Sequence, residues 1–265
     1  GNNAPLIVEQ ASLSLDTEEP AGTQAPSGAI AVVGLGMVVG EASDRHEFEE
    51  AVFESDGLVR NGEVRTERVG LGLGGLRFPP NDLRQALGQQ ITLLKAAREA
   101  LQEIEGLPRD TTGVFIGMGA DPEVARYGAR WRMADWARRW GTDGDWLREA
   151  RDHILPPLEA AGVLGTMPNI PANRLNSQFD LAGPSCTVSA EEASGLCALE
   201  LAKRSLRAGE LDAALVGAVD MSCEPVHRAA AAALLPEDRQ TPGDAAVVLV
   251  IKRLSDARRD GDRVL

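Results

Sequence analysis

The sequence is poor in the side chains that most often carry catalysis or hold metals. Its 265 residues include three cysteines, three histidines and one tyrosine. Three scattered cysteines are too few for a disulfide framework or a zinc site, so we expect a reducing, cytoplasmic location and no bound metal. The histidines lie in charged or loop-like segments, which predicts surface positions for all of them. These six residues are Cys186, Cys197, Cys223, His46, His153 and His227.

Positive charge is also scarce. Lys and Arg number 27 against 40 Asp and Glu, which gives a formal net charge of −13. Such a chain repels nucleic-acid phosphates and anionic membrane surfaces, so we expect neither as a partner. No long apolar run predicts a membrane-spanning helix, and no secretory leader is recognisable.

The composition is otherwise that of a globular protein, with 43% hydrophobic and 25% charged residues. Residues 1–28 differ, because they hold four acids and three prolines but no Lys or Arg. We predict an interdomain linker there, with a frayed terminus as the alternative. Residues 29–265 would then be the folded unit. Arg263, Val264 and Leu265 resemble the start of a further strand, so we expect this unit to be part of a larger domain.

Short apolar runs rich in β-branched residues predict buried strands, and apolar side chains three and four positions apart predict helices. Their alternation indicates an α/β domain with a largely parallel or mixed sheet. The predicted strands cover residues 29–33, 112–118, 184–188, 212–220 and 245–251, and the main helices residues 44–54, 81–105, 123–140, 146–155, 169–179 and 191–208. Ser43 is the predicted cap of the first helix.

Two motifs resemble enzyme signatures without matching them. Gly34-Leu-Gly36 after the first strand suggests dinucleotide binding, but the spacing to Gly40 is wrong by one residue and no acidic second strand follows. We interpret it as a structural turn that lets a strand and a helix pack closely. The Gly183-Pro-Ser185 segment does not form a serine-hydrolase elbow. We therefore expect no cofactor.

Aromatic residues are concentrated in one segment. All four tryptophans and the tyrosine lie between residues 127 and 146, interleaved with arginines. One hypothesis is a docking surface for an acidic partner such as a carrier protein, with Arg130, Arg138 and Arg139 as its charges. The other is an amphipathic helix whose tryptophans face the core and whose arginines are solvated.

The most informative segment is Gly183 to Arg207, in which a strand runs through a tight turn into a helix. A helix N-terminus stabilises an anion and would lower the pKa of a cysteine placed there, making it a nucleophile. This chain has Glu191 and Glu192 at that position instead.

This segment resembles the strand-turn-helix of β-ketoacyl synthases, which belong to the thiolase-like superfamily. Family members carry GPS-x-T-V-D-T-A-C-S-S-S-L with the cysteine as acyl acceptor, and here Ser189 replaces the Asp and Glu192 replaces the Cys. Further segments similar to the family follow in the same order. The matching residues are Gly183, Pro184, Ser185, Thr187, Val188, Ser194 and Leu196, and the further segments are 29–36, 89–90, 112–117, 172–174, 179–185, 206–217 and 247–262.

The resemblance implies a thiolase-like layered α/β/α fold, of which residues 29–265 supply only the N-terminal half. The family's catalytic histidines and lysine come from the second half. The form of the turn, with Ser189, Glu191, Glu192 and Ser194, is similar to chain-length-factor or pseudo-ketosynthase domains of polyunsaturated-fatty-acid and iterative polyketide synthases. That similarity implies a dimer with an active ketosynthase, a shared acyl tunnel, and an acyl carrier protein as second partner.

A carboxylate at residue 192 is a poor acyl acceptor, because a mixed anhydride lies higher in energy than a thioester. Cys186 and Cys197 do not substitute, since a strand and a helix predict core positions for them. We therefore expect no condensation by this chain. Two hypotheses for Glu192 remain: a structural anion held by helix N–H groups or an arginine, or a group that supports decarboxylation of a malonyl thioester. A malonyl-thioester decarboxylase and a carrier-docking module are the alternative functions.

Overall fold

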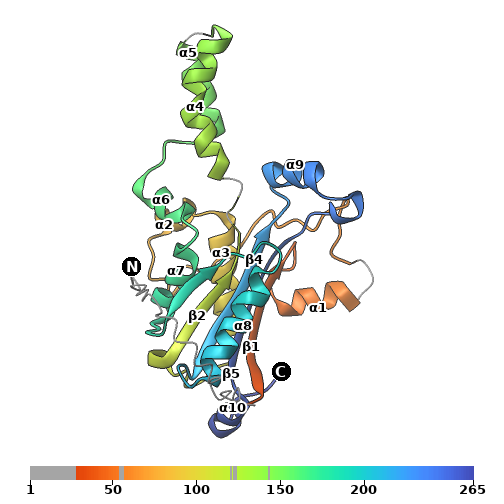
Figure 1. The fold of residues 1–265 in the computed structure, drawn as a ribbon, viewed down its shortest axis with the longest axis vertical. Helices are drawn as coiled ribbons and strands as arrows, with labels where there is room; N and C mark the ends of the chain where they lie inside the picture. The colour runs from red at the N-terminus through yellow and green to blue at the C-terminus, as the bar shows by residue number, and fades with distance from the viewer. Residues whose placement is uncertain (1–27, 54–56, 120, 122–123, 143) are drawn as a thin grey trace, which may run out of the picture.

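The computed structural model describes residues 28–53, 57–119, 121, 124–142 and 144–265. Its centre is a five-stranded sheet in the order β1-β5-β4-β2-β3 (Figure 1). β2, β3 and β4 run parallel, whereas β5 is antiparallel to both β4 and β1. The mixed sheet predicted from the sequence is therefore confirmed. The strands are β1 (Ile30–Val39), β2 (Thr112–Gly117), β3 (Ser185–Val188), β4 (Ala213–Met221) and β5 (Asp244–Arg253).

Helices cover both faces of the sheet and complete an α/β/α layering (Figure 1). α3 (Gly88–Ala100) and α7 (Ile170–Phe179) lie on one face, and α8 (Ser194–Arg207) lies on the other. The remaining helices are α1 (Arg45–Phe53), α2 (Pro80–Arg84), α4 (Ala125–Trp140), α5 (Gly144–Ile154), α6 (Ala160–Thr166), α9 (Pro225–Leu234) and α10 (Leu254–Asp260), with short 3-10 turns at Arg109–Thr111 and Glu237–Arg239. None of the described helices has both the length and the apolar character needed to cross a bilayer.

Alternation along the strands divides the core into two parts, one on each face. On β4, Leu215 packs in the cluster with α3, and its neighbour Val216 packs in the cluster with α8. On β5, Val250 and Ile251 are divided in the same way. Successive strand side chains point to opposite faces, so an uninterrupted apolar run predicts a strand covered on both sides.

The predicted turn at Gly34 and Gly36 is wrong, because β1 continues through both residues. The prediction of close packing is right, since a Cβ on Gly34 would lie 2.2 Å from the Ala100 carbonyl oxygen of α3. A Cβ on Gly36 would lie 2.1 Å from the Ala96 carbonyl oxygen. These glycines therefore let the helix approach the strand rather than turn the chain.

Other differences from the predicted elements are local. The helix predicted over residues 81–105 is two helices, α2 and α3, and the helix cap predicted at Ser43 belongs to Asp44, whose Oδ1 accepts from Glu47 N at 2.9 Å. Residues 263–265 form no strand, although Leu265 N donates to Val32 O of β1 at 3.0 Å. α9 was not predicted. The predicted linker, apart from Gly28, lies outside the described residues.

The helical pair α4–α5 stands away from the body of the molecule (Figure 1). The two helices pack chiefly on each other, and only Met133 and Ala137 of the pair are buried. Trp131 is 80% exposed and Trp140 is 62% exposed. The prediction that these tryptophans face the core is therefore wrong. The two predicted helices are present, but they pack on each other instead of on the core of the main body.

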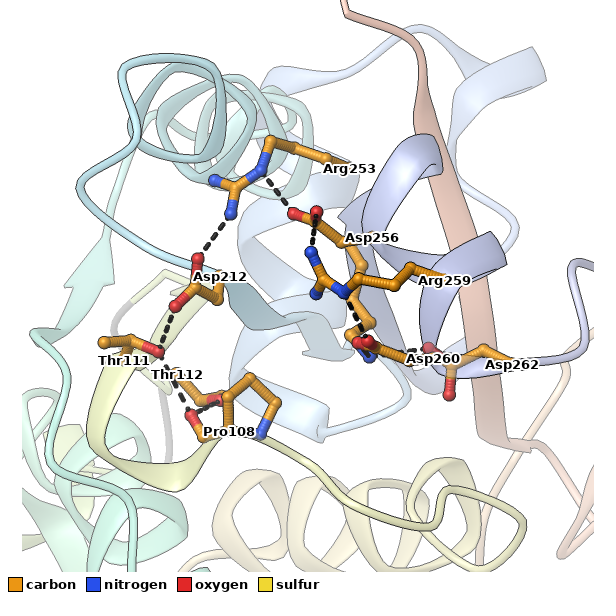
Figure 2. A network of polar contacts seen from close by, with 10 residues as sticks. Pro108, Thr111, Thr112, Asp212, Arg253, Asp256, Arg259, Asp260 and Asp262 are labelled. Carbon is orange, nitrogen blue, oxygen red and sulfur yellow. Dashed lines mark hydrogen bonds and ion pairs between the residues drawn. The ribbon is translucent and has the colours of Figure 1, made fainter.

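Polar contacts tie the strand ends together where β2 and β4 begin and β5 ends (Figure 2). Asp212 accepts from Thr111 Oγ1 at 2.7 Å and is also paired with Arg253. Arg253 in turn contacts Asp256 of α10 and donates to the backbone carbonyls of Leu206 and Leu211. One guanidinium thus links β5 to the end of α8, to the chain leading into β4 and to α10, through four hydrogen bonds.

Lys252 is fully buried beside this network and is held by two carboxylates. Its Nζ lies 2.6 Å from both Asp260 Oδ2 and Asp262 Oδ2. Burial lowers the pKa of this ammonium, but the two aspartates outweigh burial and raise the pKa overall. A buried charge is tolerated only with such partners, so this end of the sheet is fixed by complementary charge.

Because of this network, we expect the free energy of unfolding to fall at acid pH. The hydrogen bond from Thr111 and the contact with Arg253 hold the pKa of Asp212 below its ordinary 3.8. The ionised form thus stabilises the fold above the pKa of the unfolded chain, and this contribution is lost as the pH falls below about 4. We expect Asp212→Asn to lower the free energy of unfolding at pH 7 and to approach the parent at pH 3. Urea denaturation at both values measures this.

Asp110→Asn is the matched control, because Asp110 is exposed on the neighbouring 3-10 turn. It should leave stability unchanged at both pH values. An Asp212→Asn deficit of equal size at pH 7 and pH 3 would contradict the electrostatic account.

Candidate functional site

The turn between β3 and α8, residues 189–194, is a tight elbow at the carboxyl end of β3. Its backbone folds back on itself through Ala193 N to Ala190 O at 3.0 Å and Ser194 N to Glu191 O at 3.1 Å. Glu191 has a φ of 52°, in the left-handed region that side chains other than glycine seldom adopt. Such strain persists only where the surroundings enforce it.

The side chain of Ser194 stabilises the elbow through two hydrogen bonds to its backbone. Its hydroxyl is buried, accepts from Ala190 N at 2.9 Å and donates to Glu191 O at 2.6 Å. Both backbone groups therefore gain a partner from one side chain. Ser194, which was expected at the elbow, therefore holds the turn closed. Ser189 lies exposed at the start of the turn.

The elbow sits against the end of β2 because Gly117 has no side chain. A Cβ on Gly117 would lie 2.4 Å from Ser194 O and from Gly195 N. Gly195 is equally close to β4, since its Cβ would lie 2.8 Å from the Ala218 Cβ. Two glycines on facing elements thus bring the first turn of α8 onto the carboxyl ends of the parallel strands.

The elbow forms one wall of a cleft of about 640 Å³. The other walls come from the carboxyl ends of β2 and β4, from α9 and from the chain leading into β5. Ligands of α/β sheets bind at the carboxyl ends of parallel strands, so this is the expected place for a site. Its ionisable lining residues are Glu191, Glu192, Asp220, His227, Arg228 and Arg239.

Glu191 and Glu192 precede the helix rather than begin it. α8 starts at Ser194, three residues later than the sequence predicted, and both glutamates are exposed at the cleft. Among the described residues, no hydrogen bond or ion pair holds either carboxylate. The chain itself therefore leaves two solvated acids where the resemblance expects an acyl acceptor, and an arginine holding Glu192 stays a prediction.

His227 was expected at the surface but is half-buried and lines the cleft from α9. Asp220 is exposed at the end of β4, but desolvation by the surrounding protein raises its pKa, Asp244 adds to this, and His227 partly opposes it. Little in the sequence indicated that His227 belongs to a site, because the alanine-rich helix α9 has none of the usual apolar spacing. The N-cap of α9 is Glu224, whose carboxylate accepts from Val226 N and His227 N. His46 and His153 are exposed, as predicted.

The three thiols lie outside the cleft lining. Cys186 is exposed on the edge strand β3, so its predicted core position is wrong, and Cys197 is half-buried on α8. Desolvation around its sulfur raises the pKa of the Cys186 thiol, and burial with nearby Asp244 raises that of Cys223 to about 11. Neither thiol is activated as a nucleophile at neutral pH.

The three arginines proposed for docking are all on α4 but differ in their surroundings. Arg130 donates to the carbonyls of Arg151 and Leu155 and pairs with Asp152, so it fastens α4 to α5. Arg138 pairs with Asp135 of its own helix at the surface. Arg139 is exposed, with no partner among the described residues. All three lie on α4, and the α4–α5 pair, hereafter the arm, stands away from α8, which follows the elbow (Figure 1).

Removing the Ser194 hydroxyl should weaken the fold. Ser194→Ala leaves Ala190 N without its partner in a closely packed turn, which costs about 1–3 kcal/mol. Urea denaturation should show this loss in the free energy of unfolding. Ser189→Ala is the control, because that hydroxyl is exposed, and it should leave stability within about 0.5 kcal/mol of the parent. Equal stability of the two variants would show that the hydroxyl does not hold the elbow.

Solved ketosynthase structures share this fold. The ketosynthase from module 6 of the bacillaene synthase of Bacillus subtilis 168 superposes with a TM-score of 0.61 at 22% identity, over 89% of this chain and 41% of that one. The PfaC keto synthase-chain length factor superposes with a TM-score of 0.67 at 19% identity, over 86% of this chain and 29% of that one. The predicted thiolase-like fold is thus confirmed.

Sequence comparison places the chain in the same group. It is 33% identical over 195 residues to the phthioceranic/hydroxyphthioceranic acid synthase of Mycobacterium tuberculosis and 32% identical over 187 residues to the spectinabilin polyketide synthase protein NorA of Streptomyces orinoci. The chain spans 8% and 9% of the lengths of these relatives. Residues 74–257, most of the folded part, match the family described as beta-ketoacyl synthase, N-terminal domain. The chain therefore belongs to the β-ketoacyl synthase N-terminal domain family.

Proposed function

We propose that this chain is a non-condensing ketosynthase-like domain of the chain-length-factor type. In this proposal it pairs with an active ketosynthase domain in a fatty acid or polyketide synthase and helps to shape the acyl tunnel. The observation that carries the proposal is Glu192, which lines the cleft and which the sequence resemblance aligns with the family's cysteine. The superposition on a keto synthase-chain length factor supports the fold this proposal requires.

The residues of the cleft are better suited to guiding an acyl chain than to catalysing its condensation. Condensation needs a nucleophile that forms a thioester with the acyl chain and later releases it. A carboxylate would form an anhydride instead, which is higher in energy and hydrolyses in a cleft open to water. None of the described thiols lines this cleft, so no other residue replaces the sulfur.

An open sheet edge next to the elbow supports a partner domain on this side. β3 is a terminal strand of the sheet and pairs only with β2 among the described strands. α8 contacts β3, and its Leu196 and Leu201 are 72% and 42% exposed. An unpaired strand edge with exposed leucines is a surface that proteins normally cover.

The same proposal interprets the ends of the chain. Residues 29–265 would be the N-terminal half of the ketosynthase-like domain, and residues 1–28 would be a linker from a preceding domain. Its partners would be the active ketosynthase and an acyl carrier protein that brings the acyl chain. The family match over residues 74–257 supports the first of these assignments.

His227 favours one alternative function. Decarboxylation of a malonyl thioester needs groups that stabilise the developing enolate and supply a proton. His227, Asp220 and Glu192 all line the cleft, so groups able to exchange protons are available there. A malonyl-thioester decarboxylase is therefore the second candidate.

A thiol at residue 192 should restore acyl transfer to the cleft. We expect the parent chain, mixed with acyl and malonyl thioesters of an acyl carrier protein, to form neither an acyl adduct nor a new C–C bond. Glu192→Cys should gain one acyl adduct, which intact-mass and peptide analysis would locate at residue 192.

Ser189→Cys is the matched control, since it adds a thiol to the same elbow outside the cleft lining. It should stay unacylated or react far more slowly. Condensation by the parent chain alone would overturn the non-condensing assignment.

Release of CO₂ distinguishes the two candidate functions. For the scaffold, we expect the parent chain to release no CO₂ from a malonyl thioester above the uncatalysed rate. A catalysed release that falls by about 10²-fold or more in both Glu192→Ala and His227→Ala would instead establish the decarboxylase, because general acid-base groups contribute on that scale. Radiometric trapping of CO₂ is the measurement.

A further inference from the structure

We propose that the α4–α5 arm is a docking site for an acidic helical surface of an acyl carrier protein domain. The proposal rests on the proposed function, because that function supplies the carrier as a partner. It assigns the arm a role separate from the elbow. The elbow governs whether an acyl group is accepted, and the arm would govern whether its carrier binds.

The arm has one face that no other part of the described chain covers. Trp131, Arg138 and Arg139 recur on α4 at spacings of seven and eight residues, so they share one side of the helix with Arg132. All four are exposed, and Trp131 is 80% exposed. An indole this exposed among arginines is the composition of an interface anchor rather than of an ordinary solvated helix.

The opposite side of α4 holds the arm together, which leaves the docking face free for a partner. Met133 and Ala137 are buried toward α5, and Arg130 fastens α4 to the last turn of α5 through two backbone carbonyls. Trp140 packs edge-on against Trp146 across the turn, with ring centroids 6.3 Å apart. The exposed face is therefore presented by a stiffened pair of helices.

Charge selects an acidic occupant. α4 carries five arginines and one acid, Asp135, on a chain whose net charge is −13. Arg132 and Arg139 have no ion-pair partner among the described residues, so they are available to a ligand. Complementary charge of this kind speeds association and orients the partner. An acidic helix with an apolar side chain beside its acids fits both Trp131 and the arginines.

The tryptophans make the experiment specific. All four tryptophans of the chain lie in the arm region, so intrinsic tryptophan fluorescence reports the arm alone when the added protein has no tryptophan. A purified, tryptophan-free acyl carrier protein domain is titrated into the full chain at low and high salt. We expect a saturable emission change whose apparent Kd rises with salt, since exposed charges are screened.

The test variant is Arg138→Glu with Arg139→Glu, and the control is Arg204→Glu with Arg258→Glu. All four arginines are exposed, and both double variants change the net charge equally. Arg204 is on α8 and Arg258 is on α10, outside the α4–α5 arm. The test variant should weaken binding by about tenfold or more, and the control should stay within about twofold of the parent. Trp131→Ala, followed by calorimetry, should also weaken binding.

Two results would overturn the proposal. One is equal binding by the parent and the test variant. The other is self-association of the parent, seen by ultracentrifugation and abolished by the test variant, which would make a second acidic copy of this chain the occupant. Neither result bears on the elbow, because a chain that binds no carrier at the arm can still lack condensation. The acyl-transfer assay with Glu192→Cys tests that separately.

Discussion

The contact that positions the site is the approach of α8 to the end of β2. Gly117 and Gly195 remove the side chains that would hold these elements apart, and the Ser194 hydroxyl closes the turn through two backbone hydrogen bonds. The strained φ of Glu191 follows from this closure. The direction in which residue 192 meets the cleft is therefore fixed by three small residues that themselves have no reactive group.

The opposite end of the sheet is held by charge instead of close packing. Arg253, Asp212 and the buried Lys252 connect the starts of β2 and β4 with the end of β5 and with α10 (Figure 2). Parallel strands that are fixed at their amino ends keep their carboxyl ends in register. The cleft can then hold Glu191 and Glu192, whose carboxylates have no partner among the described residues, because the sheet beneath it does not depend on them for stability.

Most strands and helices could be predicted from local patterns, because apolar runs and helical spacing are properties of a short segment. The turn expected at Gly34 and Gly36 was wrong because the need for these glycines comes from α3, about 60 residues later in the chain. The elbow could be located from its motif, but its late helix start depends on Ser194 meeting Ala190. The sequence predicted a surface position for His227, because the cleft that this residue lines is formed by segments far apart in the chain. The exposure of Trp131 likewise follows from the position of the whole arm.

The residues that shape the elbow differ from the residue that would carry its chemistry, and the proposed loss of the nucleophile requires such a separation. Substituting Gly117 or Ser194 would disturb the turn, whereas the side chain of residue 192 is exposed and contributes no contact to it among the described residues. An exchange of sulfur for a carboxylate at that position therefore removes reactivity at little cost in stability. The fold, the open edge of β3 and the cleft do not depend on that side chain, and in the proposed function these are the parts that a partner domain would contact. Under that proposal, the chain would keep an assembly role without a nucleophile at residue 192.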